Sequence, residues 1–259
     1  MNNAILAANL IALFATASIQ AAYADESGKF SLETGMDYNT GKYGGTQSTD
    51  ILYVPVTGRY QDKSWTLKLT VPYLQISGPS NVINGVGLTG AATTNTISTR
   101  SGLGDVIAAA THNAYNGGAS GLLVNLTGKV KFGTASSAKG LGTGKNDYSL
   151  QSEVYQMQGN LTSFANVGDK IHGAPVGYVL NDVFYGSLGG SYKFDQETNG
   201  GMMLNLGQKS TAKGSSRIEA IFFASHRFDK NLKAQGYVLK GFSKSVPAWG
   251  AGATIAFLL

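Results

Sequence analysis

Apolar and polar residues alternate with a period of two over most of the chain after Asp25. The clearest case is the segment 64–74, where one face carries Trp65, Leu67, Leu69, Val71 and Tyr73. The other face carries Ser64, Thr66, Lys68 and Thr70. An apolar row that begins and ends on an aromatic residue is typical of a strand whose outer face meets lipid and whose ends lie at the two membrane interfaces. The pattern therefore predicts a membrane-spanning strand.

The same alternation returns in residues 121–132 and 216–228. In the second of these, the face opposite Ile218 and Phe222 is mixed, because Ile221 and Phe223 interrupt its charged residues. Segments of this kind number about twelve, which leaves roughly twenty residues for each strand and its connection. Their centres lie near Leu32, Val54, Leu69, Ala108, Leu126, Leu150, Phe164, Leu188, Leu204, Phe222, Val238 and Ala253. The predicted fold is all-β, a transmembrane antiparallel up-and-down β-barrel.

Connection lengths support this fold because short and long connections largely alternate. The short ones are rich in Asn, Asp and Gly, which form turns, and they lie at Gln61–Lys63, Tyr115–Ser120, Gln158–Asn160, Asp195–Gly200 and Asp229–Asn231. The longer ones are Asn39–Ser48, Gln75–Ser101, Gly133–Asn146 and His172–Asp182. Short periplasmic turns and longer extracellular loops are the rule in outer-membrane barrels.

The last segment, 249–259, alternates up to the final residue, with Phe257 two positions before Leu259. We expect the outer-membrane assembly machinery to bind this strand. A soluble β-sandwich is the alternative, but it would have to bury both apolar faces and would not explain the N-terminal segment. That segment has an apolar run, Ala4–Ala17, and a small-residue site before Asp25, which predicts a signal peptide at 1–24 and a barrel at 25–259. A retained anchor helix is the alternative for residues 1–24.

Composition narrows the function classes. Only 14% of residues are charged and none is cysteine, which excludes disulfides and thiol chemistry. The net charge of +5 is modest and unclustered, so we expect no nucleic-acid partner. The sequence Gly85–Gly90 matches G-x-G-x-x-G in spelling, but no helical pattern follows it, as a dinucleotide site would require. We predict no cofactor and no metal.

Catalysis is the main rival to transport, because a barrel could carry a serine and a histidine for lipid hydrolysis. The histidines are His112, His172 and His226. None lies in a nucleophile motif of the Gly-x-Ser-x-Gly type, and we interpret them as interface or loop residues rather than as general bases.

Four segments of the chain carry a resemblance to a known family. They are Ser101–Val106, Gly128–Thr134, Gly140–Tyr148 and Tyr185–Tyr192. These segments resemble the outer-membrane transporter family that is named for the MetA pathway of phenol degradation. The resemblance implies a barrel that passes organic, often aromatic, compounds, and it transfers no catalytic residue to this chain.

The predicted inward faces are mainly basic. They carry Arg59, Lys68, Lys129, Lys131, Lys193, Arg217 and Arg227, opposed by few acids, chiefly Glu219. Rings of Lys and Arg in a water-filled pore favour anions, although inward charges can also pair with one another to hold a narrow barrel together. The loop Gln75–Ser101 is longer than most unstructured loops, and its apolar residues predict that it narrows or gates the pore. Deleting residues 81–95 should then raise the conductance.

The sequence as a whole predicts an outer-membrane channel of a Gram-negative bacterium that takes up small organic solutes, anionic or aromatic, by passive diffusion. Its partners would be outer-membrane lipid and lipopolysaccharide, its solutes and the assembly machinery. A lipid-modifying barrel enzyme and a non-conducting structural or adhesion barrel remain as alternatives.

Overall fold

The structure, a computed structural model, describes residues 28–79, 82–83, 87–88, 97–176, 179–211 and 214–259. The predicted signal peptide at 1–24 lies outside these residues. The elements are β1 (Lys29–Gly41), β2 (Thr49–Gln61), β3 (Trp65–Pro79), β4 (Val82–Ile83), β5 (Gly87–Leu88), β6 (Ile97–Leu103), β7 (Ile107–Asn116), the 3-10 turn η1 (Gly118–Ser120), β8 (Leu122–Lys131), β9 (Asp147–Gln158), β10 (Leu161–Ile171), β11 (Val183–Lys193), β12 (Thr198–Gly207), β13 (Arg217–Arg227), β14 (Leu232–Gly241) and β15 (Trp249–Leu258).

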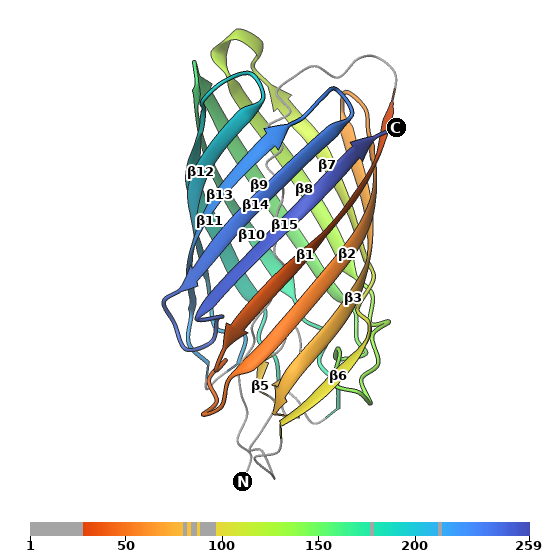
Figure 1. Ribbon diagram of the computed structural model, residues 1–259. Coiled ribbons are helices and arrows are strands. Elements are labelled where there is room, and N and C mark those ends of the chain that lie inside the picture. Colours follow the sequence, from red (N-terminus) through yellow and green to blue (C-terminus); the bar gives the residue numbers. More distant parts are fainter. Residues whose placement is uncertain (1–27, 80–81, 84–86, 89–96, 177–178, 212–213) are drawn as a thin grey trace.

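These strands form a closed antiparallel barrel in which successive strands pair and β15 returns to β1, so that Ser31 lies opposite Leu258. Strands β6 and β7 pair with the two halves of β3, so they act as one interrupted strand. The barrel therefore has twelve strands, as the sequence predicts, and each predicted centre lies within its strand. The strands are tilted along the barrel (Figure 1). Strands β4 and β5 pair only with each other.

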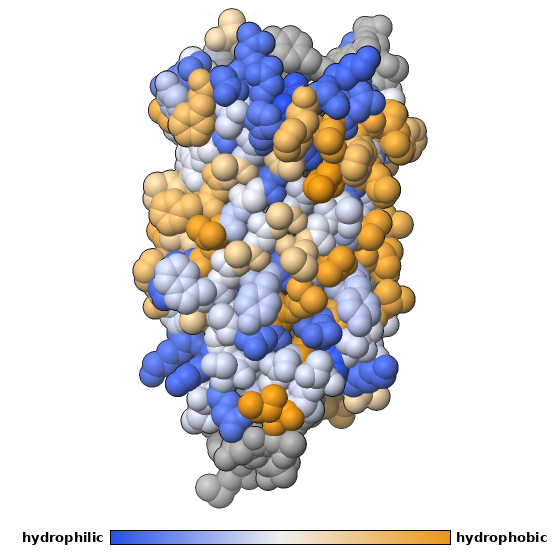
Figure 2. Space-filling model, in the orientation of Figure 1, coloured by the Kyte–Doolittle hydropathy of each residue, from blue (hydrophilic) through white to orange (hydrophobic). Residues whose placement is uncertain are grey.

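The outer wall is apolar. On β3, the predicted apolar row is exposed, from Trp65 at 46% to Tyr73 at 42%, whereas Thr66, Lys68 and Thr70 between them are less exposed and face the lumen. Exposed aromatic residues gather towards both ends of the barrel. At the short-turn end they are Phe30, Trp65, Tyr115, Tyr192, Phe194, Phe228 and Phe257, and at the loop end Tyr38, Tyr73, Phe132, Tyr148, Phe184, Phe242 and Trp249. Figure 2 shows apolar side chains along the wall and charged ones near its two ends. The wall has the outer surface of a membrane-spanning barrel.

Three of the short turns are built in the same way around an aspartate. Oδ1 of Asp62 accepts hydrogen bonds from the backbone N–H groups of Ser64 and Trp65, at 2.8 and 2.7 Å. Asp195 and Asp229 accept the equivalent pairs of N–H groups. A carboxylate in this position satisfies the donors of a tight turn, and these bonds lower the pKa of Asp62 and Asp195 below the usual range. Some boundaries differ from their predictions, since β12 already begins at Thr198, within the predicted turn Asp195–Gly200, and β7 continues to Asn116, within the predicted turn Tyr115–Ser120.

The loop end differs from the sequence prediction in one respect. The predicted loop Gln75–Ser101 is strand at both ends, because β3 continues to Pro79 and β6 begins at Ile97. Between these strands only the backbone of β4 and β5 is described, so the predicted constriction lies largely outside the described residues. No helix among the residues that the structure describes is long and apolar enough to cross a membrane.

The connection 132–146, between β8 and β9, does enter the loop end of the barrel. Its Ala135 and Leu141 are 4% and 2% exposed, and they form a cluster with inward-facing residues of β2 and β3 and with Tyr43 from the β1–β2 loop. The strand residues in this cluster are Ile51, Tyr53, Leu74 and Ile76. The connection between β8 and β9 is therefore one loop that packs inward in the described structure.

Candidate functional site in the lumen

The basic residues of the lumen form one continuous row across neighbouring strands. Arg59 on β2 pairs in register with Lys68 on β3, and Lys68 pairs with Ala109 on β7. The row continues from Ala109 through Lys129 on β8 and Ser149 on β9 to Lys170 on β10. Because the strands are tilted, the row climbs from the short-turn end at Arg59 to the loop end at Lys170. Sequence reasoning found three of its four cations and missed Lys170.

The other predicted lining residues lie at the two ends of the barrel. Lys193 and Arg227 are exposed near the short turns, and Arg217 lies at the loop end, with its guanidinium 3.6 Å from the carboxylate of Glu219. Neither group belongs to the basic row. Their places follow from strand boundaries, which alternation alone fixes poorly.

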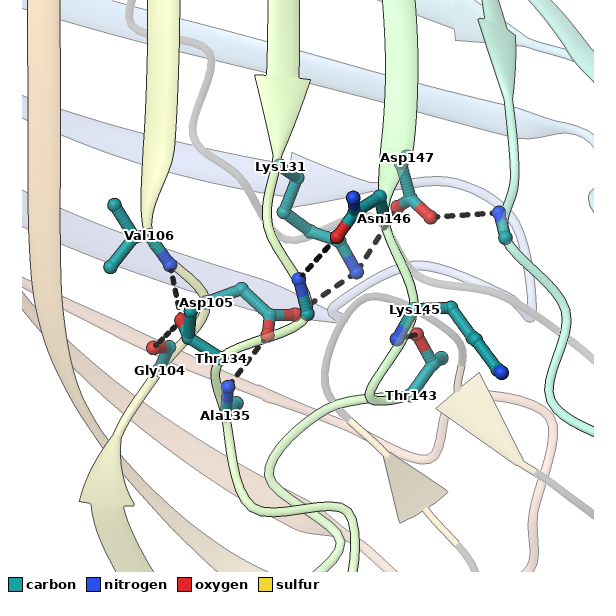
Figure 3. Close-up of polar contacts among 12 residues, drawn as sticks. Gly104, Asp105, Val106, Lys131, Thr134, Ala135, Thr143, Lys145, Asn146 and Asp147 are labelled. Carbon is teal, nitrogen blue, oxygen red and sulfur yellow. Dashed lines mark hydrogen bonds and ion pairs between the residues drawn. The ribbon is translucent and has the colours of Figure 1, made fainter.

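An ion-pair network fastens the loop end of the barrel. Nζ of Lys131 lies 3.0 Å from Oδ2 of Asp105 and 3.2 Å from Oδ2 of Asp147, and Lys170 lies 3.0 Å from the same Asp147 oxygen. The other oxygen of Asp147 accepts the N–H of Gly173 at 3.1 Å. Figure 3 shows how Lys131 joins the two carboxylates, of which Asp105 lies between β6 and β7 and Asp147 is the first residue of β9.

Asp105 occupies the break between β6 and β7 and anchors the inward loop. Its Oδ1 accepts the N–H of Ala135 at 2.8 Å. Beside it, the Thr134 hydroxyl accepts the N–H of Val106 at 2.9 Å and donates to the carbonyl of Gly104 at 3.3 Å (Figure 3). The strand is interrupted where its backbone groups turn to hold the 132–146 connection. The segment Ser101–Val106, which is part of the family resemblance, therefore has a structural role in holding the loop. Its amino-acid pattern alone did not indicate that role.

The expectation that few acids face the lumen is wrong. Besides Glu219, buried carboxylates belong to Asp37, Asp147 and Glu153. The Tyr237 hydroxyl donates to Asp37 at 2.6 Å, and the Gln151 amide donates to Glu153 at 2.5 Å. The sequence signal for these acids was present, because each lies on the inward parity of its strand. Any anion preference must therefore come from a local imbalance rather than from the whole wall.

That imbalance lies in the middle of the basic row. In the part of the chain that the structure describes, the amines of Lys68 and Lys129 form no ion pair. Glu153 interacts electrostatically with both, and Glu33 does so with Lys68, but neither carboxylate is within ion-pair distance of these amines. Lys129 and Lys131 point into the same lumen from one strand, but only Lys131 is neutralised at short range.

An apolar row lies on the other wall. Register pairs connect Tyr155, Phe164, Gly189, Met203, Ile221 and Leu239, from β9 to β14. A Cβ at Gly189 would lie 2.7 Å from both Met203 Cβ and Phe164 Cζ, so glycine at this position leaves room for the Phe164 ring. Phe164 and Phe223 pack against the buried cluster of Met203, Ile221, Tyr237 and Leu239.

The two walls enclose a cavity of about 140 Å³. Its lining includes Lys129, Lys131 and Lys170 from the basic side and Phe164, Met203, Ile221 and Phe223 from the apolar side. Lumen residues of a wide porin are mainly polar, so an apolar wall facing cations is a departure that needs a chemical reason. Among the described residues, no cluster of His, Cys, Asp and Glu has the composition of a metal site.

The three histidines have structural partners. Nδ1 of His112 lies 3.2 Å from the carbonyl of Ser64, and its ring stacks on Trp65 with centroids 4.6 Å apart. Nδ1 of His226 lies 2.9 Å from the Thr198 hydroxyl, and its ring meets Phe228 edge-on. His172 is buried beyond the end of β10, with Nδ1 2.9 Å from the carbonyl of Asn181. Burial, followed by the nearby Lys170 ammonium, lowers the pKa of His172 to about 4, although Asp147 opposes the shift.

Solved outer-membrane channels share this architecture. The chain is similar to the COG4313 outer membrane channel from Pseudomonas putida F1, with 13% identity, a TM-score of 0.71 and alignment over 92% of this chain and 98% of that one. It is also similar to the NanC porin, with 10% identity, a TM-score of 0.57 and coverage of 88% and 100%. No family model and no curated protein matches the sequence. The fold is that of outer-membrane channel barrels.

The chain is accordingly an outer-membrane barrel of the Gram-negative type. A closed barrel with an apolar outer belt and two aromatic girdles is the form in which proteins span that membrane. The resemblance to the family named for the MetA pathway stays a prediction, because the similarity to these solved barrels is a similarity of fold alone.

Proposed function

We propose that the chain is a passive outer-membrane channel for small organic solutes and that its basic row gives it a preference for anions. One observation carries the proposal: a membrane-spanning barrel encloses a cavity whose lining includes Lys129, an amine that forms no ion pair with any described residue. A channel that works by diffusion down a gradient needs no cofactor and no catalytic group. The resemblance of its segments to the family named for the MetA pathway supports organic solutes.

The roles of the lining residues follow from their places. Arg59, Lys68 and Lys129 would act on passing anions, because they lie along the row from its short-turn end at Arg59 to its middle at Lys129. Lys131 and Arg217 would hold the loop end together, through Asp105, Asp147 and Glu219. Lys193 and Arg227 would attract anions at the periplasmic mouth, where both are exposed.

The proposal includes the path by which the chain reaches the membrane. Residues 1–24 would direct export and be removed, and the β15 segment that ends at Leu258 would be bound by the assembly machinery. The exposed wall would then contact lipid and lipopolysaccharide. The histidine contacts described above would anchor the rings, and the proposal contains no enzymatic step.

Ion currents test the proposal. Residues 25–259, refolded and inserted into a planar bilayer, should give discrete conductance steps, and the reversal potential in a KCl gradient should show that chloride is preferred. Correct folding is checked beforehand by the slower gel migration of the heated sample. A silent bilayer from folded protein would overturn the proposed channel.

A further inference from the structure

The basic row and the apolar row face each other across the lumen. In the strand order, β12 lies six positions around the barrel of twelve from β3, so Lys68 and Met203 come from opposite sides. Lys129 on β8 and Ile221 on β13 are five positions apart in the same order, and both line the cavity. A molecule in the cavity would contact both walls at once.

The apolar wall is not needed to complete a membrane barrel. A lumen that only conducts water and salt is served by polar side chains, and apolar groups facing water lose about 25 cal/mol for each Å² that could have been buried. Ile221, Met203 and Leu239 are nevertheless turned inward at 3%, 8% and 8% exposure, and the partly buried Phe164 and Phe223 pack against this cluster and line the cavity with it. The exposed parts of these two rings gain free energy when an apolar group covers them.

The facing amine specifies the other end of the ligand. Lys129 lines the cavity and forms no ion pair among the described residues, so its ammonium group can accept a carboxylate of a solute. Lys131 and Lys170 also line the cavity, but Asp147 already holds both. One carboxylate is therefore the charge that this wall accommodates.

The cavity has room for a small organic molecule. Its volume of about 140 Å³ corresponds to roughly ten water molecules when each requires about 10–15 Å³. A compact ring or short chain that bears one carboxylate fits this space.

We propose that the lumen contains a binding site for small amphipathic monocarboxylates, with the carboxylate at Lys129 and the apolar body on the wall of Phe164, Met203, Ile221 and Phe223. This inference rests on the proposed channel function and names the class of solute that the channel selects. The site combines charge with apolar area, so neither property alone should give tight binding.

Block of the KCl current in single channels tests the site. The probes are cyclohexanecarboxylate, cyclohexylmethanol, which has the same ring without the charge, and acetate, which has the charge without the ring. Cyclohexanecarboxylate should halve the current at a concentration at least about tenfold below that of either other probe, because a charged hydrogen bond and the buried ring each contribute more than a factor of ten.

Two variants separate the contributions. Lys129→Met should weaken the block by cyclohexanecarboxylate about tenfold and leave that by cyclohexylmethanol unchanged. Ile221→Thr should weaken cyclohexanecarboxylate and leave acetate unchanged. Lys230→Met changes an exposed lysine of a short turn and is the matched control, which should behave as the unmodified protein does.

The outcomes also distinguish the site from the channel. Folded protein that carries no current would overturn the channel itself. A current that all three probes block equally, or a block by cyclohexanecarboxylate that survives both Lys129→Met and Ile221→Thr, would overturn the binding site while leaving the channel intact.

Discussion

Lys129 and Lys131 are two residues apart on the lumen face of β8, yet their surroundings differ completely. Lys131 lies between two carboxylates at 3.0 and 3.2 Å and joins the β6–β7 break to the start of β9. Lys129 forms no ion pair with any residue that the structure describes. A basic residue in the lumen can therefore either stabilise the barrel through ion pairs or remain available to a solute. The carboxylates on neighbouring strands determine which of these roles it has.

The largest expected effect is the loss of stability when Lys131 is replaced. Lys131→Met should lower the free energy of unfolding by about 3 kcal/mol, because it leaves the Asp105 and Asp147 carboxylates buried with less compensating charge. Lys129→Met should change it by less than about 1 kcal/mol, since no pair is broken. Urea unfolding in detergent micelles measures both variants. Equal losses would show that the two lysines have the same role.

The histidine next to the network should make stability depend on pH. An unfolded His172 takes up a proton as the pH falls through 6.5, whereas the folded one, with a pKa of about 4, does not. Between these values the unfolded state binds more protons, so the free energy of unfolding falls as the pH is lowered. From pH 7.5 to pH 5.0 this contribution is about 2 kcal/mol.

His172→Gln supplies the control for that dependence. The variant should lose less stability than the unmodified protein over the same pH change, with the difference measured by urea unfolding at both pH values. Parallel losses in the two proteins would place the pH dependence in other groups.

Glu153 should reduce the anion preference near Lys129, because its carboxylate interacts electrostatically with both Lys68 and Lys129. Glu153→Gln keeps an acceptor for the Gln151 amide, removes the negative charge and should increase the chloride preference about twofold to threefold. Reversal potentials in a KCl gradient measure the change. A shift towards potassium would contradict the role given to this wall.

The smallest effect is expected in the short turns. Asp229→Ala removes the carboxylate that accepts the N–H groups of Asn231 and Leu232 and should cost about 1 kcal/mol. The conductance should not change, because the turn lies away from the loop end and its network. A changed conductance in the folded variant would contradict this separation.

Much of the fold was predictable because the residues of a barrel strand alternate between an apolar outer face and a polar inner face. The row from Trp65 to Tyr73 and the turn at Asp229 needed no tertiary information. The inward acids were harder to predict, since Glu153 and Asp147 belong to a segment where polar residues occupy both faces. Pairing between distant residues, such as Lys131 with Asp105, depends on register and on a strand break that no local pattern reveals.

The candidate site was predictable only in part, for the same reason. Lys68 and Lys129 were recognisable as inward cations, and Ile221 and Phe223 as an anomaly on the inward face of β13. That these residues oppose one another depends on strand number and tilt, which place β3 opposite β12. The inward loop expected at Gln75–Ser101 lies largely outside the described residues and stays a prediction. The inward packing of the 132–146 connection through Leu141 was not predicted.

The most direct test of the account is the reversal potential of single channels in a KCl gradient, compared between the unmodified protein and Lys129→Glu. We predict chloride preference in the unmodified protein and a clear shift towards potassium in the variant, with the same heat-dependent gel migration in both. Potassium preference in the unmodified protein, or an unchanged potential in a folded Lys129→Glu channel, would contradict the claim that an unpaired lysine selects the solute.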